Sequence, residues 1–471
     1  EIERVRVSAF RSPLQITGMR QLAFPTEVIF CILREATLVP EALDTSPSIF
    51  FENRDVVLQL VHDSMKTKAS LSLVSKTFHN VMEFYLYEIV MIFRFEYVPI
   101  LLRSLRTTPL GFCIPRGHRC RRLDFYLGIG NIIYADEAWY EGGHTLWGLI
   151  PTCPKLEILM ARVVRSVQGL DFPHLTHKAL WKTIVAYSSK TLRRIELYGF
   201  WIRTDRLEMM LRYLTNLEAC RIIGARKFDP HLDTYDDEEP KKRHLGRNRK
   251  ICLKDDWDYS KLSGWFDAST VEEFKAAKEK SQWPPFDSPP PYTLPSLHTL
   301  RVDRLDLKRL HQFSFPRLRH LDMTCFPDNR LDLCATYTHF PSSVTHLIYG
   351  GDYNPLVHFL QFFPQVRQLT LALEFGDFPA SNYEFVAPHL HLEIVELATW
   401  DYNLELQPRI RDILTAVRAE KVPSLHTIKL TPPWKYKELP LVEECDALGV
   451  RLEQVVRPEP TFCGMSKRHQ E

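Results

Sequence analysis

The chain has 471 residues, of which 45% are hydrophobic and 25% charged, a profile typical of soluble globular proteins. Sixty Lys and Arg residues against 58 Asp and Glu residues give a formal net charge of +2, which argues against a dedicated nucleic-acid binder because such proteins carry a strong basic surplus. The length exceeds that of one compact core, so it predicts either two or three domains or one elongated repeat array.

Neither a membrane span nor a disulfide framework is indicated. The most apolar stretch, 85–102, is interrupted by three charged residues, so no membrane-spanning helix is expected. The ten cysteines are scattered without a Cys-x-x-Cys pair, which predicts a reducing compartment, either cytoplasm or nucleus. The tightest group, Cys113, His118 and Cys120, lacks the second half of a zinc site and is interpreted as reduced thiols beside a histidine.

The N-terminal part of the chain has a helical pattern. Residues 1–20 show no period and are expected to form a flexible lead-in. Apolar residues recur on one helical stripe over 28–36, where Pro25 suits the first helical position and Glu27 suits the positive end of the helix dipole. A first helix is therefore predicted here.

Two further helices are predicted before residue 92. A loop is expected over 40–54, followed by a helix over 55–65 and a third over 68–85. The third has a single apolar face made by residues three and four apart, which are Leu71, Val74, Phe78, Val81 and Tyr85. The pattern predicts a small module of three packed helices over 21–92.

Beyond residue 100 a short phrase recurs, in which an aliphatic residue, two mostly polar residues, an aliphatic, one polar residue and an aliphatic follow one another. The clearest copies are 297–302 after Pro295 and 318–323 after Pro316. Other copies begin at Leu156, Leu192, Leu217, Val344, Val366, Leu392 and Leu425, and a degenerate copy spans 122–125. The later copies begin 21 to 33 residues apart, which is close to the period of leucine-rich repeats.

Each phrase is interpreted as a short strand whose aliphatic side chains point inward. The residues between copies must return to start the next parallel strand, and 353–363 and 408–419 have helical character. The predicted fold over 100–456 is therefore an irregular leucine-rich-repeat α/β solenoid with a curved parallel sheet and its helices outside. An ordinary α/β sheet with chance phrasing is the alternative. Many of the 32 prolines fall just before a strand, where a missing amide donor is tolerated.

One segment interrupts the repeats at about 225–293. It contains an acidic and then basic block at 236–250, which is interpreted as a solvated loop or as a nuclear import signal. Proline clusters then predict an extended linker before the repeats resume. The tail 457–471 is expected to be disordered.

Signatures of catalysis are missing from the sequence. There is no Gly-x-Gly-x-x-Gly, no phosphate-binding Gly-Lys-Ser/Thr loop, no Gly-x-Ser-x-Gly elbow and no His-Glu-x-x-His. No cofactor is expected. Several histidines lie inside the repeat phrase between inward aliphatics, which places them outward as a polar, partly protonatable surface; they are His298, His320, His346 and His426.

The N-terminal module resembles the F-box of the fungal F-box-like proteins. The family's opening Leu-Pro-x-Glu corresponds to Phe24-Pro25-Thr26-Glu27, with Phe where Leu is usual. Its Leu-x-x-Val-Ser/Cys-Lys/Arg-x-Trp/Phe stretch corresponds to 71–78, with Phe78 as the closing aromatic that is often Trp in the family. The separation of these two parts implies a loop insertion at 38–54. Repeats of the kind that follow are the family's usual companion.

The resemblance implies a non-catalytic substrate receptor of a cullin–RING (SCF-type) ubiquitin ligase, which binds an adaptor subunit through the F-box and a target protein through the repeats. Carried over by position, the adaptor-binding residues or their supports are Leu22, Pro25, Glu27, Ile29, Ile32, Leu33, Leu73 and Val74. Target-binding positions expected on the outward surface of the repeats are His298, Arg301, Arg319, Asp322, His346, Arg367, Glu396 and Lys429. Neither nucleic acid nor a membrane is expected as a partner. A leucine-rich-repeat scaffold outside ubiquitination and a catalytic domain hidden in the repeats or the insertion are the alternatives.

Overall fold

The computed structural model describes residues 25–46, 54–94, 97–109, 113–128, 146–164, 178–226, 292–302, 313–323, 342–350, 360–373, 388–399, 406–431 and 441–455. Several predictions fall outside these residues: Leu22, the lead-in 1–20, the block 236–250, the proline linker, most of the helix at 353–363, and the tail 457–471. Across the described ranges, no helix is both long enough and apolar enough to cross a membrane.

The N-terminal helices are α1 (Thr26–Thr37), the 3-10 helix η1 (Pro40–Leu43), α3 (Arg54–Ser72) and α4 (Lys76–Leu86). As predicted, α1 begins directly after Pro25 and carries Glu27 in its first turn. Leu33 of α1 packs with Val81, Met82 and Tyr85 of α4 in a small core of their own.

The prediction of one helix over 68–85 is wrong, because the chain turns at 73–75 between α3 and α4. The hydroxyl of Ser75 accepts a hydrogen bond from the backbone N–H of Phe78 at 3.1 Å and so caps the start of α4. Val74 therefore leaves the predicted apolar stripe and is 64% exposed. A serine in the middle of an apolar pattern competes for backbone hydrogen bonds, which is the local reason for the break.

Every copy of the repeat phrase forms a strand. The strands of the main sheet are β1 (Ile89–Ile92), β2 (Arg122–Gly128), β3 (Ile158–Val164), β4 (Arg194–Arg203), β5 (Ala219–Arg226), β7 (Thr299–Val302), β9 (His320–Met323), β10 (His346–Gly350), β11 (Gln368–Leu373), β12 (Ile394–Thr399), β13 (Thr427–Thr431) and β14 (Arg451–Gln454). In the described part of the chain they make one 12-stranded parallel sheet in chain order, while β6 (Tyr292–Thr293) and β8 (Phe313–Ser314) pair separately. Because each copy pairs with the copies before and after it, the fold is a solenoid-like α/β array.

The two end strands were not predicted. β14 was missed, and β1 lies within 21–92, the segment assigned entirely to the helical module, yet it pairs with β2 in parallel. Its four residues, Ile-Val-Met-Ile, are apolar on both faces because Val90 and Ile92 enter the core of the array while Ile89 packs against helical residues. A continuous apolar run of this length cannot be told from the end of a buried helix by periodicity.

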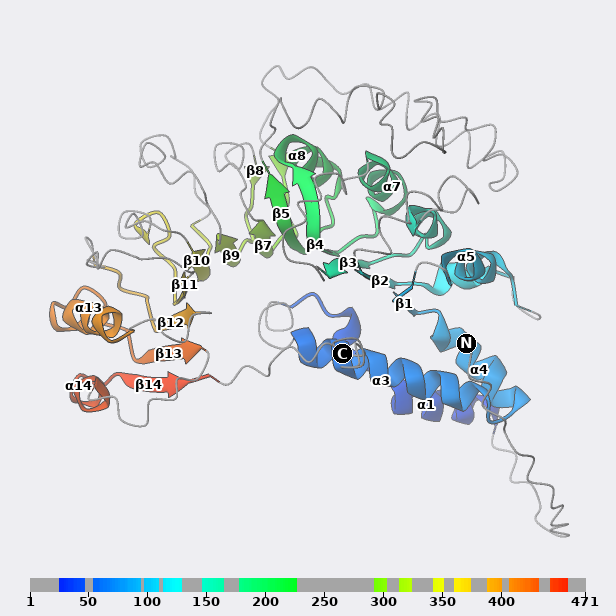
Figure 1. Ribbon diagram of the computed structural model, residues 1–471, viewed down its shortest axis with the longest axis horizontal. Helices are drawn as coiled ribbons and strands as arrows, with labels where there is room; N and C mark the ends of the chain where they lie inside the picture. Colours follow the sequence, from blue (N-terminus) through cyan, green and yellow to red (C-terminus); the bar gives the residue numbers. More distant parts are fainter. Residues whose placement is uncertain are drawn as a thin grey trace, which may run out of the picture.

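The return segments carry the remaining helices, which are α5 (Val98–Arg106), η3 (Arg116–Arg119), η4 (Leu146–Thr152), α7 (Lys178–Ser188), α8 (Thr204–Tyr213), α13 (Gln407–Arg418) and α14 (Leu441–Ala447). Figure 1 shows α5, α7, α8, α13 and α14 on the outer side of the curved sheet, and α1 and α3 on its inner side. The prediction of outer helices is confirmed, including that over 408–419, which corresponds to α13.

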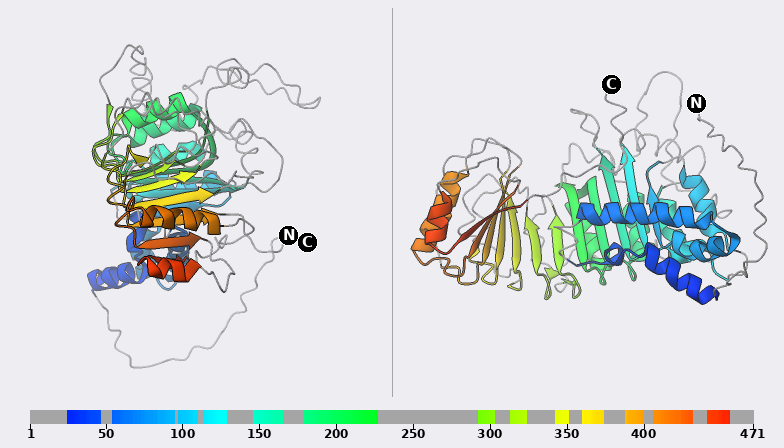
Figure 2. Two further views of the ribbon diagram at one scale, coloured as in Figure 1. Left: turned by 90° about the vertical axis from the view of Figure 1, so that its left-hand side faces the viewer. Right: turned by 90° about the horizontal axis from the view of Figure 1, so that it is seen from below.

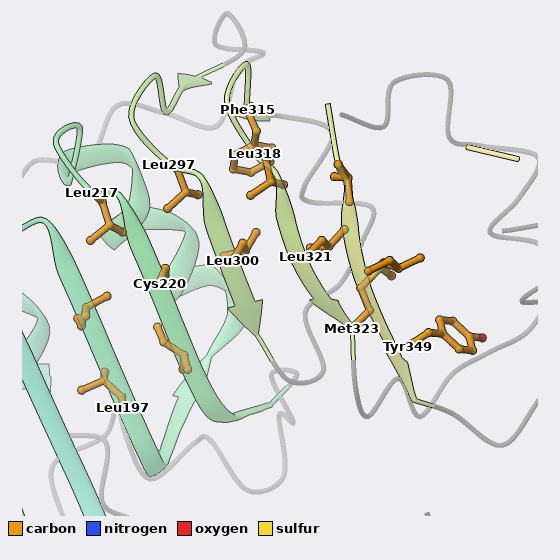
Figure 3. Packing of buried hydrophobic residues seen from close by; sticks show 14 of the residues in the cluster. Leu197, Leu217, Cys220, Leu297, Leu300, Phe315, Leu318, Leu321, Met323 and Tyr349 are labelled. Atoms are coloured by element: carbon orange, nitrogen blue, oxygen red, sulfur yellow. The ribbon is translucent and has the colours of Figure 1, made fainter. Parts of the chain in front are cut away.

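The core of the array is one layer of aliphatic side chains between the sheet and the return segments. Figure 3 shows this layer continuing from Leu197 and Cys220 through Leu300 and Leu321 to Tyr349. Each coil ends in a turn just before its strand; for example, the N–H of Leu318 donates to the carbonyl of Phe315 at 3.2 Å. Prolines occupy the second position of such turns, where their fixed φ is suited and no amide donor is needed.

Gly117 provides a test of the packing between two coils. A methyl group added there would lie 2.0 Å from the backbone oxygen of Thr152, and backbone cannot give way as a flexible side chain can. We expect Gly117→Ala to lower the free energy of unfolding by ~3 kcal/mol, the upper end for overpacking, as measured by urea titration. Gly449→Ala is the control: with φ at +69° and no atom within 4 Å, it should cost only the left-handed backbone penalty of ~1 kcal/mol. Equal losses of stability in the two variants would contradict the close packing of Gly117 against Thr152.

Candidate protein-binding surfaces

The inner face of the first strands is covered by the N-terminal helices. Val57 and Val61 of α3 and Ala42 of η1 form a buried cluster with Ile89 of β1. Seen from below in Figure 2, α3 runs across the first strands rather than along them. We call residues 38–46, which link α1 to α3 and include η1, the strap.

Arg122 of β2 fixes the strap to the sheet. Its side chain is fully buried and donates to both carboxylate oxygens of Asp124, at 2.7 to 3.0 Å, on the same strand face. Its remaining guanidinium nitrogen, Nη1, donates to the backbone carbonyl of Ala42 at 2.7 Å. Although burial works to lower it, the Asp124 carboxylate raises the pKa of Arg122 above its ordinary value, so the guanidinium stays charged.

Arg194 of β4 repeats this arrangement two strands away. Its Nε donates to Glu196 at 2.7 Å, and its Nη1 donates to the backbone carbonyl of Asp44 at 2.8 Å. The next residue of the strap, Thr45, hydrogen-bonds through its hydroxyl to the carboxylate of Glu218. The strap therefore crosses the sheet from β2 toward β5, held by its main-chain carbonyls.

The residues directly before successive strands form a second feature, which we call the edge ladder. Their backbone groups continue the sheet; the N–H of Arg121 donates to Glu88 O, and the N–H of Glu157 donates to Arg121 O. In chain order the ladder is Glu88, Arg121, Glu157, Arg193, Glu218, His298, Arg319, Thr345, Arg367, Glu393 and His426. Its first five members alternate in charge and pair with their neighbours, at Arg121–Glu88 3.4 Å, Arg121–Glu157 2.6 Å, Arg193–Glu157 3.5 Å and Arg193–Glu218 2.8 Å.

The structure divides the predicted target-binding residues into two rows. His298, Arg319 and Arg367 belong to the edge ladder. The inner face of the sheet carries the others, Arg301, Asp322, His346, Glu396 and Lys429, since they alternate with the core residues of their strands.

Asp322 and Glu396 lie on the predicted face, but the expectation that they are surface positions is not met. They are 1% and 4% exposed. Arg301 pairs with Asp322 at 3.0 Å, and the hydroxyls of Thr370 and Thr431 donate to Glu396 at 3.1 and 2.8 Å. Neighbouring strands thus satisfy these carboxylates, and only the more exposed residues of the two rows remain as contact residues.

The histidines of the phrase do not form the partly protonatable surface that was expected. The rings of His320 and His346 stack with centroids 4.1 Å apart. Burial lowers the pKa of His320 to about 3, and His346, His298 and Arg319 add to this effect by charge repulsion. Burial also lowers the pKa of His298 and His346, so these three rings are neutral at pH 7.

The helical module exposes apolar side chains at one end. Leu73 is 85% exposed in the turn after α3, beside Val74, and Ile32 of α1 is 54% exposed. Ile29 and Leu71 pack against the same buried cluster, so the N-terminal half of α1 lies beside the end of α3 that leads into this turn. We call Leu73 and Val74 the apolar end.

The other residues carried over from the resemblance have different surroundings. Pro25 and Glu27 are exposed, and the backbone carbonyl of Pro25 accepts the first hydrogen bonds of α1 from Val28 and Ile29. Leu33 is 2% exposed, so it supports the module from within and cannot itself contact an adaptor.

Comparison with protein-family models and with curated proteins finds no match for this sequence. Among the described residues, no group of three or more His, Cys, Asp or Glu side chains is placed to hold a metal ion. That statement includes Cys113, His118 and Cys120, of which Cys113 is exposed and Cys120 buried.

Neither the strap nor the two sheet arginines that bind it, Arg122 and Arg194, was predicted from the sequence. A signal was present, because both arginines stand two residues before an acid on the same strand face, as Arg122-Leu123-Asp124 and Arg194-Ile195-Glu196. Their alternation with inward aliphatics puts them on the outward face of each strand, but outward residues are exposed only where nothing covers the sheet.

The Arg122 contacts give a stability prediction. Arg122→Met leaves the buried Asp124 carboxylate without its guanidinium, so we expect a loss of ~3–5 kcal/mol in the free energy of unfolding, together with faster proteolysis within 38–46. Arg122→Met combined with Asp124→Leu should recover much of this loss, because no unpaired charge then remains buried. Arg193→Gln, which removes the partly exposed ladder pairs to Glu157 and Glu218, serves as control and should cost at most ~1 kcal/mol for each pair. A similar cost for Arg122→Met would refute the role of the buried pair.

The lowered pKa values of His298, His320 and His346 predict that the stability of the fold depends on pH. A histidine whose pKa is lowered on folding binds fewer protons in the folded than in the unfolded state. Its contribution is therefore constant above pH ~6.5, the unfolded value, and stability falls as the pH drops from there toward about 3. We expect His320→Asn to lose less stability between pH 7 and pH 4 than the wild type, measured by urea titration at each pH. His79→Asn, at an exposed site of α4, should follow the wild-type profile; if both variants do, the prediction fails.

Proposed function

We propose that this chain is a target receptor of a cullin–RING ubiquitin ligase, with an F-box-like module that binds the adaptor subunit and an irregular leucine-rich-repeat array that binds the target. The observation that carries the proposal is the apolar end. Leu73 and Val74 belong to the stretch that resembles the F-box, and they leave apolar surface facing solvent where a partner would bury it.

The energetic case rests on Leu73. Burying a leucine side chain of this exposure contributes about 1.5–3 kcal/mol, and each 1.4 kcal/mol is roughly tenfold in affinity. Val74, the next residue of the same turn, is 64% exposed, so one partner surface can gain from both residues.

The rigid attachment of the helical module to the array supports a receptor role. The strap, α3 and β1 attach it to the array through buried contacts. A target held on the uncovered part of the array would then keep a defined position relative to a bound adaptor, which raises the effective concentration of the target near the rest of the ligase.

Co-purification of the full chain with the adaptor subunit of cullin–RING ligases tests this proposal. We expect the wild type to retain the adaptor, Leu73→Ala to weaken binding about tenfold, and Leu73→Glu to abolish it, because a carboxylate would be buried in an apolar interface. Isothermal titration calorimetry gives the affinities. Surface substitutions are the cleaner test, since deleting 20–92 would also remove β1 and the strap.

Leu60→Glu is the matched control. Leu60 is also an exposed leucine of α3, but it lies 13 residues before Leu73, about 20 Å along the helix axis, and its substitution should leave adaptor binding unchanged. A folded wild-type chain that ignores the adaptor would exclude the proposal and favour the alternative, a leucine-rich-repeat scaffold outside ubiquitination.

A further inference from the structure

The edge ladder changes character after Glu218, the ladder residue that Thr45 of the strap contacts. Up to Glu218, acids and bases alternate and each arginine has a carboxylate partner. Beyond it, the neutral Thr345 stands between Arg319 and Arg367, whereas the earlier position flanked by two arginines carries an acid, Glu157. Both arginines are exposed, and within the described ranges Arg367 forms one ion pair, a long contact of 3.7 Å to Glu393 on its far side.

We infer that this part of the edge ladder binds an extended acidic segment of the target protein, whose carboxylates supply the negative charge that the ladder lacks between Arg319 and Arg367. The inference rests on the proposed function only in taking the array as the target-binding part. It names the chemistry of the segment, which the F-box resemblance does not.

The strap provides the structural precedent. Its extended residue Asp44 and its neighbour Thr45 already lie against this edge, with the Thr45 hydroxyl on Glu218, and the negative charges of Glu218 and Asp44 both act on His298, the next ladder residue. A second extended segment placed beyond the strap would continue the same path across the strands.

Distances favour a polypeptide with a particular spacing of acids. Neighbouring strands are about 4.8 Å apart, so Arg319 and Arg367, two strands apart, are separated by roughly 10 Å along the ladder. In a polyproline II conformation, carboxylates three residues apart lie on the same side of the extended chain and span a similar ~9 Å, at about 3.1 Å per residue. The near-neutral net charge of +2 and the acidic neighbours Glu218 and Glu393 disfavour a polyphosphate backbone as the occupant.

The experiment selects a displayed library of random 12-residue peptides on the full chain and on variants at Thr345. We expect enriched peptides to carry Asp or Glu three residues apart, and a synthetic enriched peptide to bind the wild type in fluorescence anisotropy. Thr345→Glu places a carboxylate of the chain itself between Arg319 and Arg367, so it should weaken binding of that peptide at least tenfold. Thr345→Gln, of nearly the same shape but uncharged, is the control and should bind within about twofold of the wild type.

Further variants separate this site from a general charge effect. Arg319→Gln and Arg367→Gln should each weaken the peptide about fivefold, the upper value for one exposed ion pair of ~1 kcal/mol. Arg411→Gln removes an exposed arginine of α13 and should change nothing. The inference would be overturned by any of three results. These are enriched peptides without acids, an equal loss of peptide affinity with Arg411→Gln, or tighter binding of a uridine oligonucleotide at the same arginines.

The outcome is independent of the adaptor experiment. Acidic peptides that bind while the adaptor does not would leave this inference standing and exclude the ligase role. Adaptor binding without acidic peptides would exclude this inference alone.

Discussion

The arrangement of the whole molecule depends on two buried guanidinium groups that donate to main-chain carbonyls of the strap. A buried charge is tolerated only when it is paired and its donors are satisfied. Asp124 and Glu196 neutralise Arg122 and Arg194, but the Nη1 donors still need acceptors, which Ala42 and Asp44 supply. Because the arginines belong to the array and the carbonyls to the strap, neither part is fully satisfied without the other, so the helices and the first strands form one folding unit.

That constraint also decides which surfaces are open to partners. The strap and α3 occupy the inner face of the first strands, leaving the later strands and the edge ladder to meet a macromolecule. At the other side, the same packing turns Leu33 inward and leaves Leu73 in solvent. The two candidate surfaces are thus consequences of one docking arrangement, and a change that loosens the strap would alter both together.

Sequence reasoning succeeded where the determining pattern is local. The strands were predicted because inward aliphatics repeat within six residues, and α1 because Pro25 and Glu27 mark its start. It failed where the partner is distant in sequence, since Arg122 and Ala42 are 80 residues apart and Arg194 and Asp44 150. The break at Ser75 was missed for a different reason, because a single cap competed with an apolar stripe that suited a continuous helix equally well.

The edge ladder shows why stability alone does not account for the sequence at the strand edges. Two arginine charges about 10 Å apart in water repel by only ~0.4 kcal/mol, and salt screens this further. The stability of the fold therefore gains little from an acid between Arg319 and Arg367, just as it gains little from partly exposed pairs such as Arg193–Glu157. What the alternation in the first half does favour is the order of the strands, since skipping one coil would place two like charges side by side. The later coils do not need that device, because the Thr370–Glu396–Thr431 hydrogen bonds already tie neighbouring strands together from the inner face.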